Sequence, residues 1–112
     1  MADTDNWGRD PSVQIMRGVF NRMEEAQGEF LRRLCIGPLD TRLRNWRAHA
    51  LQCFERGWIQ AASRGMHLGE EKAAATYVHC LARTMVSGGI SVPLEALPND
   101  EDIEMLLEEV FR

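Results

Sequence analysis

The stretch from Asp40 to Arg64, which decides the fold, reads DTRLRNWRAHALQCFERGWIQAASR. Its apolar and small residues recur every three or four positions, as on one face of an α-helix. They are Leu43, Trp46, Ala50, Cys53, Phe54, Gly57, Trp58 and Ala61. With Asp40 as N-cap, the pattern predicts a helix over residues 41–64, about 36 Å long. Because Leu51 and Trp58 widen the apolar set, we expect this helix to lie centrally and contact more than one neighbour.

Another helix is predicted before this stretch, over residues 11–35. It has a proline at its first position, and its apolar residues follow a 3,4 spacing that only Gln27 interrupts. Those residues are Val13, Met16, Phe20, Met23, Phe30 and Leu34. The tripeptide Ile36-Gly37-Pro38 then predicts the end of this helix.

Two more helices are predicted later in the chain. Glycines bound one over residues 70–87, and Asp100 or the residue before it caps another over residues 100–111. The latter is so short that it must dock, on its own chain or on a partner. No segment alternates as a strand does. The predicted fold class is all-α, a small helical bundle of about four helices. It forms one domain over residues 10–112, after a flexible acidic arm over residues 1–9.

Charge is unevenly distributed along the 112 residues, whose net charge is −4. Residues 30–64 carry seven arginines and two acids, whereas residues 84–112 carry seven acids and one arginine. A locally basic segment allows contact with nucleic acid despite the acidic total. No apolar run is long enough for a membrane span, and three cysteines without paired spacing favour a reducing compartment. We therefore expect a cytoplasmic protein that makes no contact with a membrane.

Polar side chains without acids form a row beside the apolar face of the helix over residues 41–64. The members of this row are Arg42, Asn45, His49, Gln52 and Arg56. A similar outer strip on the helix over residues 70–87 comprises Lys72, Thr76, His79 and Arg83. If adjacent, the two strips would make a basic groove that follows a phosphate backbone, and Arg32, Arg33 and Arg44 could extend it. The same patterns are also typical of solvated helix faces. Without interleaved aromatic residues, sequence-specific readout is not indicated.

Other kinds of site have less support. His49 with Cys53 and His79 with Cys80 could supply four zinc ligands, but helical cysteines are more often small core residues. The sequence contains no glycine-rich phosphate loop, no suitably spaced carboxylate pair and no recognisable Ser/Cys–His–acid set. We therefore expect no catalytic residues, no metal and no cofactor, and a protein that is not an enzyme.

Three apolar residues are candidates for protein contacts. Leu51 and Trp58 form a second apolar edge, which packs against the helix over residues 100–111 or contacts another subunit. Trp7 lies in the acidic arm, and it either stays unpacked or anchors into a partner. The acidic C-terminal face could pair with the arginine-rich face of a neighbouring copy, and such head-to-tail contacts build filaments.

In size, helix content and charge layout, residues 10–112 resemble the small subunits of multisubunit CRISPR effector complexes. In that family, helical bundles stack along the assembly and hold a nucleic-acid strand with basic faces. The resemblance implies a non-catalytic subunit of an antiviral ribonucleoprotein that binds RNA or DNA without sequence specificity. It implies backbone contacts by Arg42, Asn45, His49, Gln52, Arg56, Lys72, His79 and Arg83. The alternative is a protein–protein adaptor or regulatory helical subunit without nucleic acid.

Overall fold

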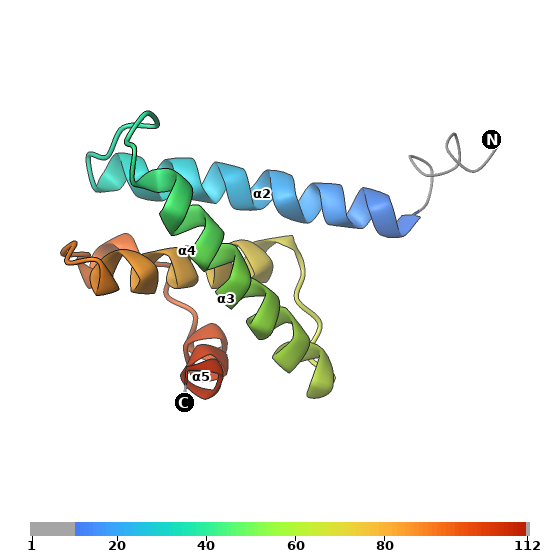
Figure 1. Cartoon of the computed structure of the whole chain (residues 1–112). Coiled ribbons are helices and arrows are strands. Elements are labelled where there is room, and N and C mark those ends of the chain that lie inside the picture. The colour runs from blue at the N-terminus through green and yellow to red at the C-terminus, as the bar shows by residue number, and fades with distance from the viewer. Residues whose placement is uncertain (1–10, 112) are drawn as a thin grey trace.

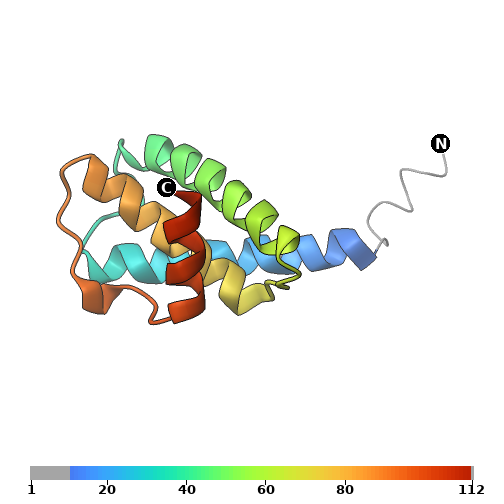
Figure 2. The same ribbon diagram turned by 90° about the horizontal axis from the view of Figure 1, so that it is seen from below.

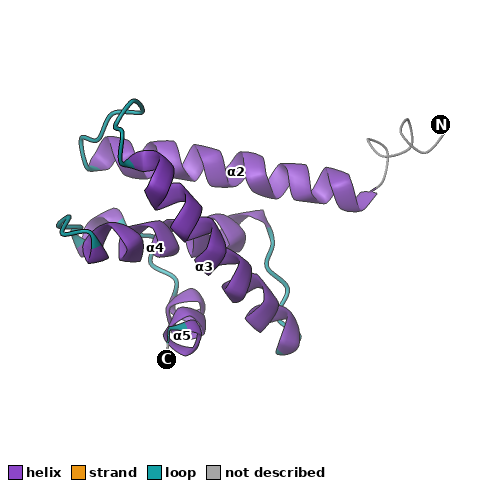
Figure 3. Ribbon diagram, viewed as in Figure 1, coloured by secondary structure: helices purple, strands orange, loops and turns teal. Residues whose placement is uncertain are grey.

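The structure, a computed structural model, describes residues 11–111, with side chains from Met16 onward. Its helices are α2 (Pro11–Arg33), α3 (Leu43–Ser63), α4 (Glu70–Ser87) and α5 (Glu101–Val110). A short 3-10 turn, Leu94–Ala96, precedes α5. No described residue is in a strand (Figure 3), which confirms the all-α bundle. The predicted arm over residues 1–9, with Trp7, lies outside the described residues.

Helix α4 is the centre of the bundle. Helix α2 lies alongside it, α3 crosses it, and α5 packs against it from a third direction (Figures 1 and 2). Every residue from Ala73 to Ala82 is buried. The alanines in this segment allow the neighbouring helices to approach closely. The prediction that the helix over residues 41–64 contacts more than one neighbour is confirmed, because α3 packs on both α4 and α5. Its predicted central place is wrong, because α4 contacts all three other helices.

The face of α2 that packs on α4 includes a polar residue. Met23 and Phe30 are buried together with Gln27. The Gln27 side-chain oxygen accepts a hydrogen bond from the Tyr77 hydroxyl of α4. Burial raises the pKa of Tyr77, which keeps this hydroxyl protonated as a donor. The residue that interrupts the predicted stripe therefore belongs to the core, whereas Phe20, which the stripe included, is 47% exposed.

Helix α5 docks on its own chain. Asp100 caps it, and the carboxylate of this residue accepts hydrogen bonds from two backbone N–H groups of the first turn. Ile103, Leu106 and Leu107 are buried in the core. Gly57 of α3 faces this helix, and a Cβ added to it would lie in ordinary van der Waals contact, 3.7 Å from the Leu107 side chain. Burial of this apolar face provides the stabilisation that so short a helix lacks in isolation.

Helix α2 ends at an unexpected residue. Cys35 has a φ of 57°, in the left-handed region. The N–H of Ile36 donates a hydrogen bond of 2.9 Å to the carbonyl of Leu31. Turns of this kind pair helix carbonyls that would otherwise lack a donor, and they usually have glycine at the left-handed position. The turn at Cys35 thus ends α2 before the predicted stop at residues 36–38 is reached.

Replacing Cys35 with glycine should raise the free energy of unfolding by about 0.5–1 kcal/mol, because glycine adopts the left-handed region without a steric cost. The matched control is Gly65→Ala after α3, where φ is 72° and an added Cβ would meet open space. This change should lower the free energy of unfolding by a similar amount, through the backbone alone. Urea denaturation measures both, and a destabilised Cys35→Gly chain would contradict this account of the turn.

Candidate nucleic-acid interface

The predicted row on α3 lies on the surface. Its exposed members are Arg42, Asn45, His49, Gln52 and Arg56. The Arg42 guanidinium donates hydrogen bonds of 3.0 and 2.8 Å to the Asp40 carboxylate and lies 4.7 Å from the Trp46 ring centroid. The hydrogen bond from Arg42 lowers the pKa of Asp40 to about 2, so the pair stays ionised at neutral pH. Arg42 is therefore partly neutralised, whereas Arg56 has no carboxylate partner among the described residues.

The second predicted strip, on α4, is not an outer surface. Thr76 and His79 are buried, and only Arg83 at its end is exposed. The Thr76 hydroxyl donates a 2.7 Å hydrogen bond to the Lys72 carbonyl of the same helix. His79 donates through Nε2 to the Pro98 carbonyl at 2.8 Å, since a carbonyl can only accept. The prediction of an exposed strip is wrong for both residues. Their polar atoms form hydrogen bonds within the protein, so this side of α4 can be buried.

Lys72 holds the N-terminus of α5. Its Nζ atom lies 3.0 Å from Asp100 Oδ2 and 3.4 Å from Asp102 Oδ2. The hydrogen bond to Asp100 is the main cause that raises the pKa of Lys72. Partial burial raises the pKa of Asp100, but hydrogen bonds from Lys72 and from the backbone outweigh it, and the net direction is downward. The charge of Lys72 is therefore used within the fold and is not available to a ligand.

A groove of about 850 Å³ lies between α3, the C-terminal half of α4, and α5. Its polar walls include His49, Gln52, Arg56, Arg83, Glu104 and Glu108. Phe111 also lines the groove, and the Arg83 guanidinium lies 4.7 Å from its ring centroid. The structure thus brings three residues of the α3 row, His49, Gln52 and Arg56, into one groove with Arg83. Helix α5 supplies a further wall that sequence reasoning missed, because the pattern did not show where this helix docks.

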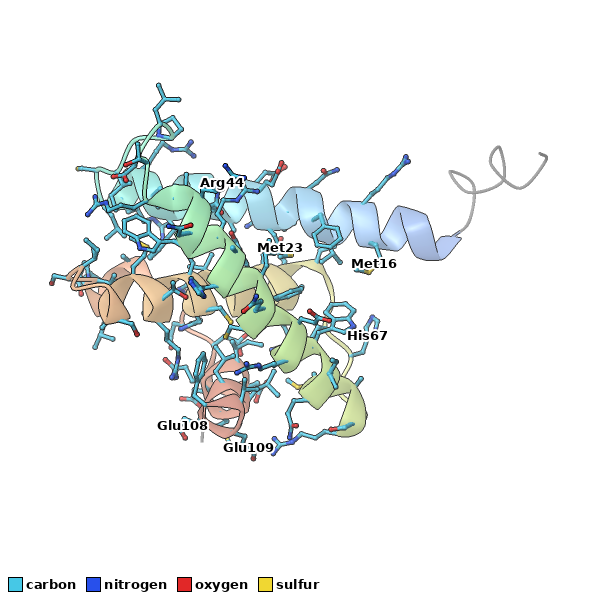
Figure 4. All side chains as sticks on the ribbon, viewed as in Figure 1. Met16, Met23, Arg44, His67, Glu108 and Glu109 are labelled. Atoms are coloured by element: carbon cyan, nitrogen blue, oxygen red, sulfur yellow. The ribbon has the colours of Figure 1, made fainter. Side chains whose placement is uncertain are left out.

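The basic and the acidic side chains of the groove lie on different walls. Arg56 and Arg83 lie on α3 and α4, whereas Glu104 and Glu108 lie on α5. In Figure 4, Glu108 lies beside α5 at the lower side of the view, whereas Arg44 lies near the start of α3 toward the upper side. In the part of the chain that the structure describes, no carboxylate pairs with Arg44, Arg56 or Arg83. An anionic ligand is therefore attracted to the α3 and α4 walls and repelled from α5.

The candidate protein-contact residues of α3 lie away from α5. The Trp58 ring packs on Phe54, with ring centroids 5.8 Å apart. The contacts that join α3 to α5 come from another side of the helix, where Gln60 and Arg64 meet Glu109. Trp58 is thus partly buried against the core by way of Phe54. Leu51 remains a surface residue, on the rim of a shallow hollow at the start of α3.

Comparison of the chain with protein-family models, curated protein sequences and solved structures finds no significant match. The function must therefore be argued from the residues themselves. Over residues 11–111, no group of three His, Cys, Asp or Glu side chains is placed to hold a metal ion. None of the described helices is both long and apolar enough to cross a bilayer.

Substitution of Asp100 separates its capping role from its ion pair. Asparagine caps a helix about as well as aspartate but carries no charge, whereas alanine removes both interactions. We expect Asp100→Ala to lower the free energy of unfolding by about 1–2 kcal/mol, and Asp100→Asn by about 0.5 kcal/mol. Urea denaturation at neutral pH measures the difference. Equal losses in the two variants would contradict the capping role.

The same variants should differ in acid. The pKa of Asp100 is lowered in the folded protein, so its ionised form adds stability above the ordinary carboxyl pKa of about 4. That stability is lost as the pH falls through the lower, folded-state pKa. The Asp100→Asn chain lacks this pH-dependent stability. Its free energy of unfolding should therefore fall less steeply than that of the parent chain below a pH of about 4. Identical acid unfolding curves would show that the Lys72 contact does not stabilise the fold.

Proposed function

We propose that this protein is a non-catalytic helical subunit that binds the backbone of a nucleic-acid strand within a larger ribonucleoprotein assembly. The observation that carries the proposal is the exposed, acid-free row on α3 together with Arg83, which lines the same groove and has no carboxylate partner among the described residues. The row contributes Asn45, His49, Gln52 and Arg56. These side chains can all donate hydrogen bonds to phosphate or sugar oxygens.

The length of the row suits a backbone contact. From Asn45 to Arg56 it extends about 16 Å along the helix axis, over which one strand of a duplex presents roughly five phosphates. Arg83 adds, in the groove that Arg56 also lines, a second guanidinium without a carboxylate partner among the described residues. The carboxylates of α5 repel phosphate and so limit the contact on that side. Since no aromatic side chain belongs to the row, its chemistry favours backbone contact without sequence readout.

Two features support a place in an assembly. The net charge of −4 opposes a polyanion at long range, so an isolated chain is a poor binder and neighbouring subunits would supply further positive charge. Arg44 and the acidic α5 lie toward different sides of the bundle (Figure 4), an arrangement compatible with stacking of copies head to tail. The proposal therefore includes copies of this chain, other subunits, and an RNA or DNA strand. Its setting would be a cytoplasmic antiviral complex of the CRISPR effector kind.

A protein–protein adaptor is the second candidate, and one observation favours it. Leu39 is 92% exposed and Leu51 is 38% exposed. Together with Pro38 and Leu43 they line a hollow of about 430 Å³ where the chain enters α3. Apolar side chains gathered on a surface often mark contact with another protein. The residues of α3 that line this hollow are different from those of the row.

Charge removal at the groove tests the nucleic-acid proposal. In the Arg56→Gln/Arg83→Gln chain, the slope of log affinity against log salt concentration should fall in magnitude by about 1.4–1.8, because each of two phosphate contacts contributes about 0.7–0.9. The probe is a fluorescent homopolymeric RNA, with DNA strands and duplexes of equal length for comparison. The matched control, Glu104→Gln/Glu108→Gln, removes two charges from the facing wall and should strengthen binding.

The outcomes separate the two candidates. An unchanged salt slope in the double arginine variant would remove the row from the interface. If neither the parent chain at low salt nor its complex purified from the host holds any nucleic acid, the nucleic-acid proposal fails. A nucleic-acid-free complex that dissociates when Leu39 and Leu51 are changed to aspartate would instead support the adaptor.

A further inference from the structure

Two cysteine thiols meet where α3 crosses α4. The Sγ atoms of Cys53 and Cys80 are 2.6 Å apart. Only 7% of Cys53 is exposed, and Cys80 is fully buried. The helices approach closely at this point because Ala50 and Gly57, one turn before and after Cys53, have no large side chain. The contact joins two helices that are distant in sequence, so the fold itself places the two sulfur atoms together.

The two thiols differ in access and in acidity. Cys53 lines the groove between α3, α4 and α5, whereas Cys80 does not. The hydrogen bond between the two thiols lowers the pKa of Cys53, and the charges of Arg83 and Arg56 act in the same direction against the effect of burial. That hydrogen bond, together with burial, raises the pKa of Cys80. Cys53 is therefore the thiol that ionises first and the one that a reagent in the groove can reach.

We propose that Cys53 and Cys80 form a dithiol site that a small, zwitterionic disulfide oxidises to an intramolecular disulfide bond. A disulfide needs a sulfur–sulfur distance of about 2.05 Å, so the two atoms have to approach by roughly half an ångström. In a reducing compartment such a bond is transient and responds to the redox state. The site opens onto the groove but does not depend on nucleic-acid binding.

The oxidation takes two thiol–disulfide exchange steps. In the first, Cys53 loses its proton and attacks one sulfur of the small disulfide. A mixed disulfide forms on Cys53, and the expelled thiolate takes up the proton. In the second, the Cys80 sulfur attacks Cys53 Sγ, the intramolecular bond forms, and the second small thiolate leaves with the Cys80 proton. The two cysteines lose two electrons and two protons in total, and one small disulfide is reduced to two thiols.

The groove indicates the chemistry of the oxidant. Its volume of about 850 Å³ lies within the range of small-ligand sites. Arg56 and Arg83 lie on the walls nearest Cys53 and suit carboxylate groups. Glu104 and Glu108 on the facing wall suit an ammonium group of the same molecule. A peptide-like disulfide that carries both charges matches this arrangement, and oxidised glutathione is a suitable probe.

The first experiment uses the Cys35→Ser chain, which removes the exposed third thiol. After incubation of the folded chain with oxidised glutathione, alkylation and intact-mass analysis should show a loss of two hydrogen atoms and no alkylated cysteine. The oxidised chain should melt about 10 °C higher, because the bond closes a long loop in the unfolded chain. The proposal would be overturned if both thiols of the folded chain could still be alkylated under conditions that oxidise the same chain when it is unfolded in urea.

A second experiment tests the order of attack. On the Cys35→Ser background, Cys80→Ser should leave Cys53 as a stable mixed disulfide with glutathione, whereas Cys53→Ser should leave Cys80 unmodified. Circular dichroism checks that each variant is folded, and Cys80→Ala replaces Cys80→Ser if the serine is not tolerated in the core. Equal modification of the two cysteines in folded chains would overturn the assignment of Cys53 as the attacking thiol.

A third measurement tests the class of ligand. Oxidised glutathione should oxidise the pair about tenfold faster than the neutral 2-hydroxyethyl disulfide, a factor that corresponds to one or two weak ion pairs. In the Arg56→Gln/Arg83→Gln chain this preference should disappear. Equal rates for the two disulfides in the parent chain would contradict a zwitterionic oxidant.

Discussion

Burial of the middle of α4 is the constraint on which the rest of the structure depends. Small side chains between Ala73 and Ala82 allow three helices to approach α4 from different directions. Polar groups in this segment must find partners inside the protein, because an unsatisfied buried donor or acceptor costs about 1–3 kcal/mol. Thr76 bonds to its own helix, Tyr77 to Gln27, and His79 to the Pro98 carbonyl. The last of these contacts ties the segment before α5 to the centre of the bundle.

The same constraint shapes the groove. Helix α5 covers the side of α4 that bears Thr76 and His79, and its acidic outer face becomes one wall. The continuously buried segment of α4 ends at Ala82, and the next residue, Arg83, is exposed and lines the same groove as the row on α3. Close approach of α3 and α4 also brings Cys53 against Cys80. One packing arrangement thus produces both the candidate nucleic-acid surface and the dithiol site.

Much of the fold could be predicted from sequence, since helix periodicity and capping are local signals. The bounds of α4 follow from the glycines around it, and the exposed row follows from the side of α3 that lacks apolar residues. The centre of the bundle could not be predicted. A hydrophobic pattern shows whether a side chain is polar, but it does not show whether a polar side chain has a hydrogen-bond partner inside the protein. Gln27 and His79 look like surface residues by that criterion, yet both are buried with a hydrogen bond. The groove and the thiol pair were missed because they depend on which helices pack together.

The most direct test of this account is amide hydrogen exchange along the folded chain. If α4 is the centre, amides from Ala73 to Ala82 should exchange only through global unfolding and should be the most slowly exchanging in the protein. Amides of α5 should exchange faster, through local release of this short helix. Exchange of the α4 amides at the rate of α5, with α3 remaining protected, would show that α3 is the centre and would contradict the account.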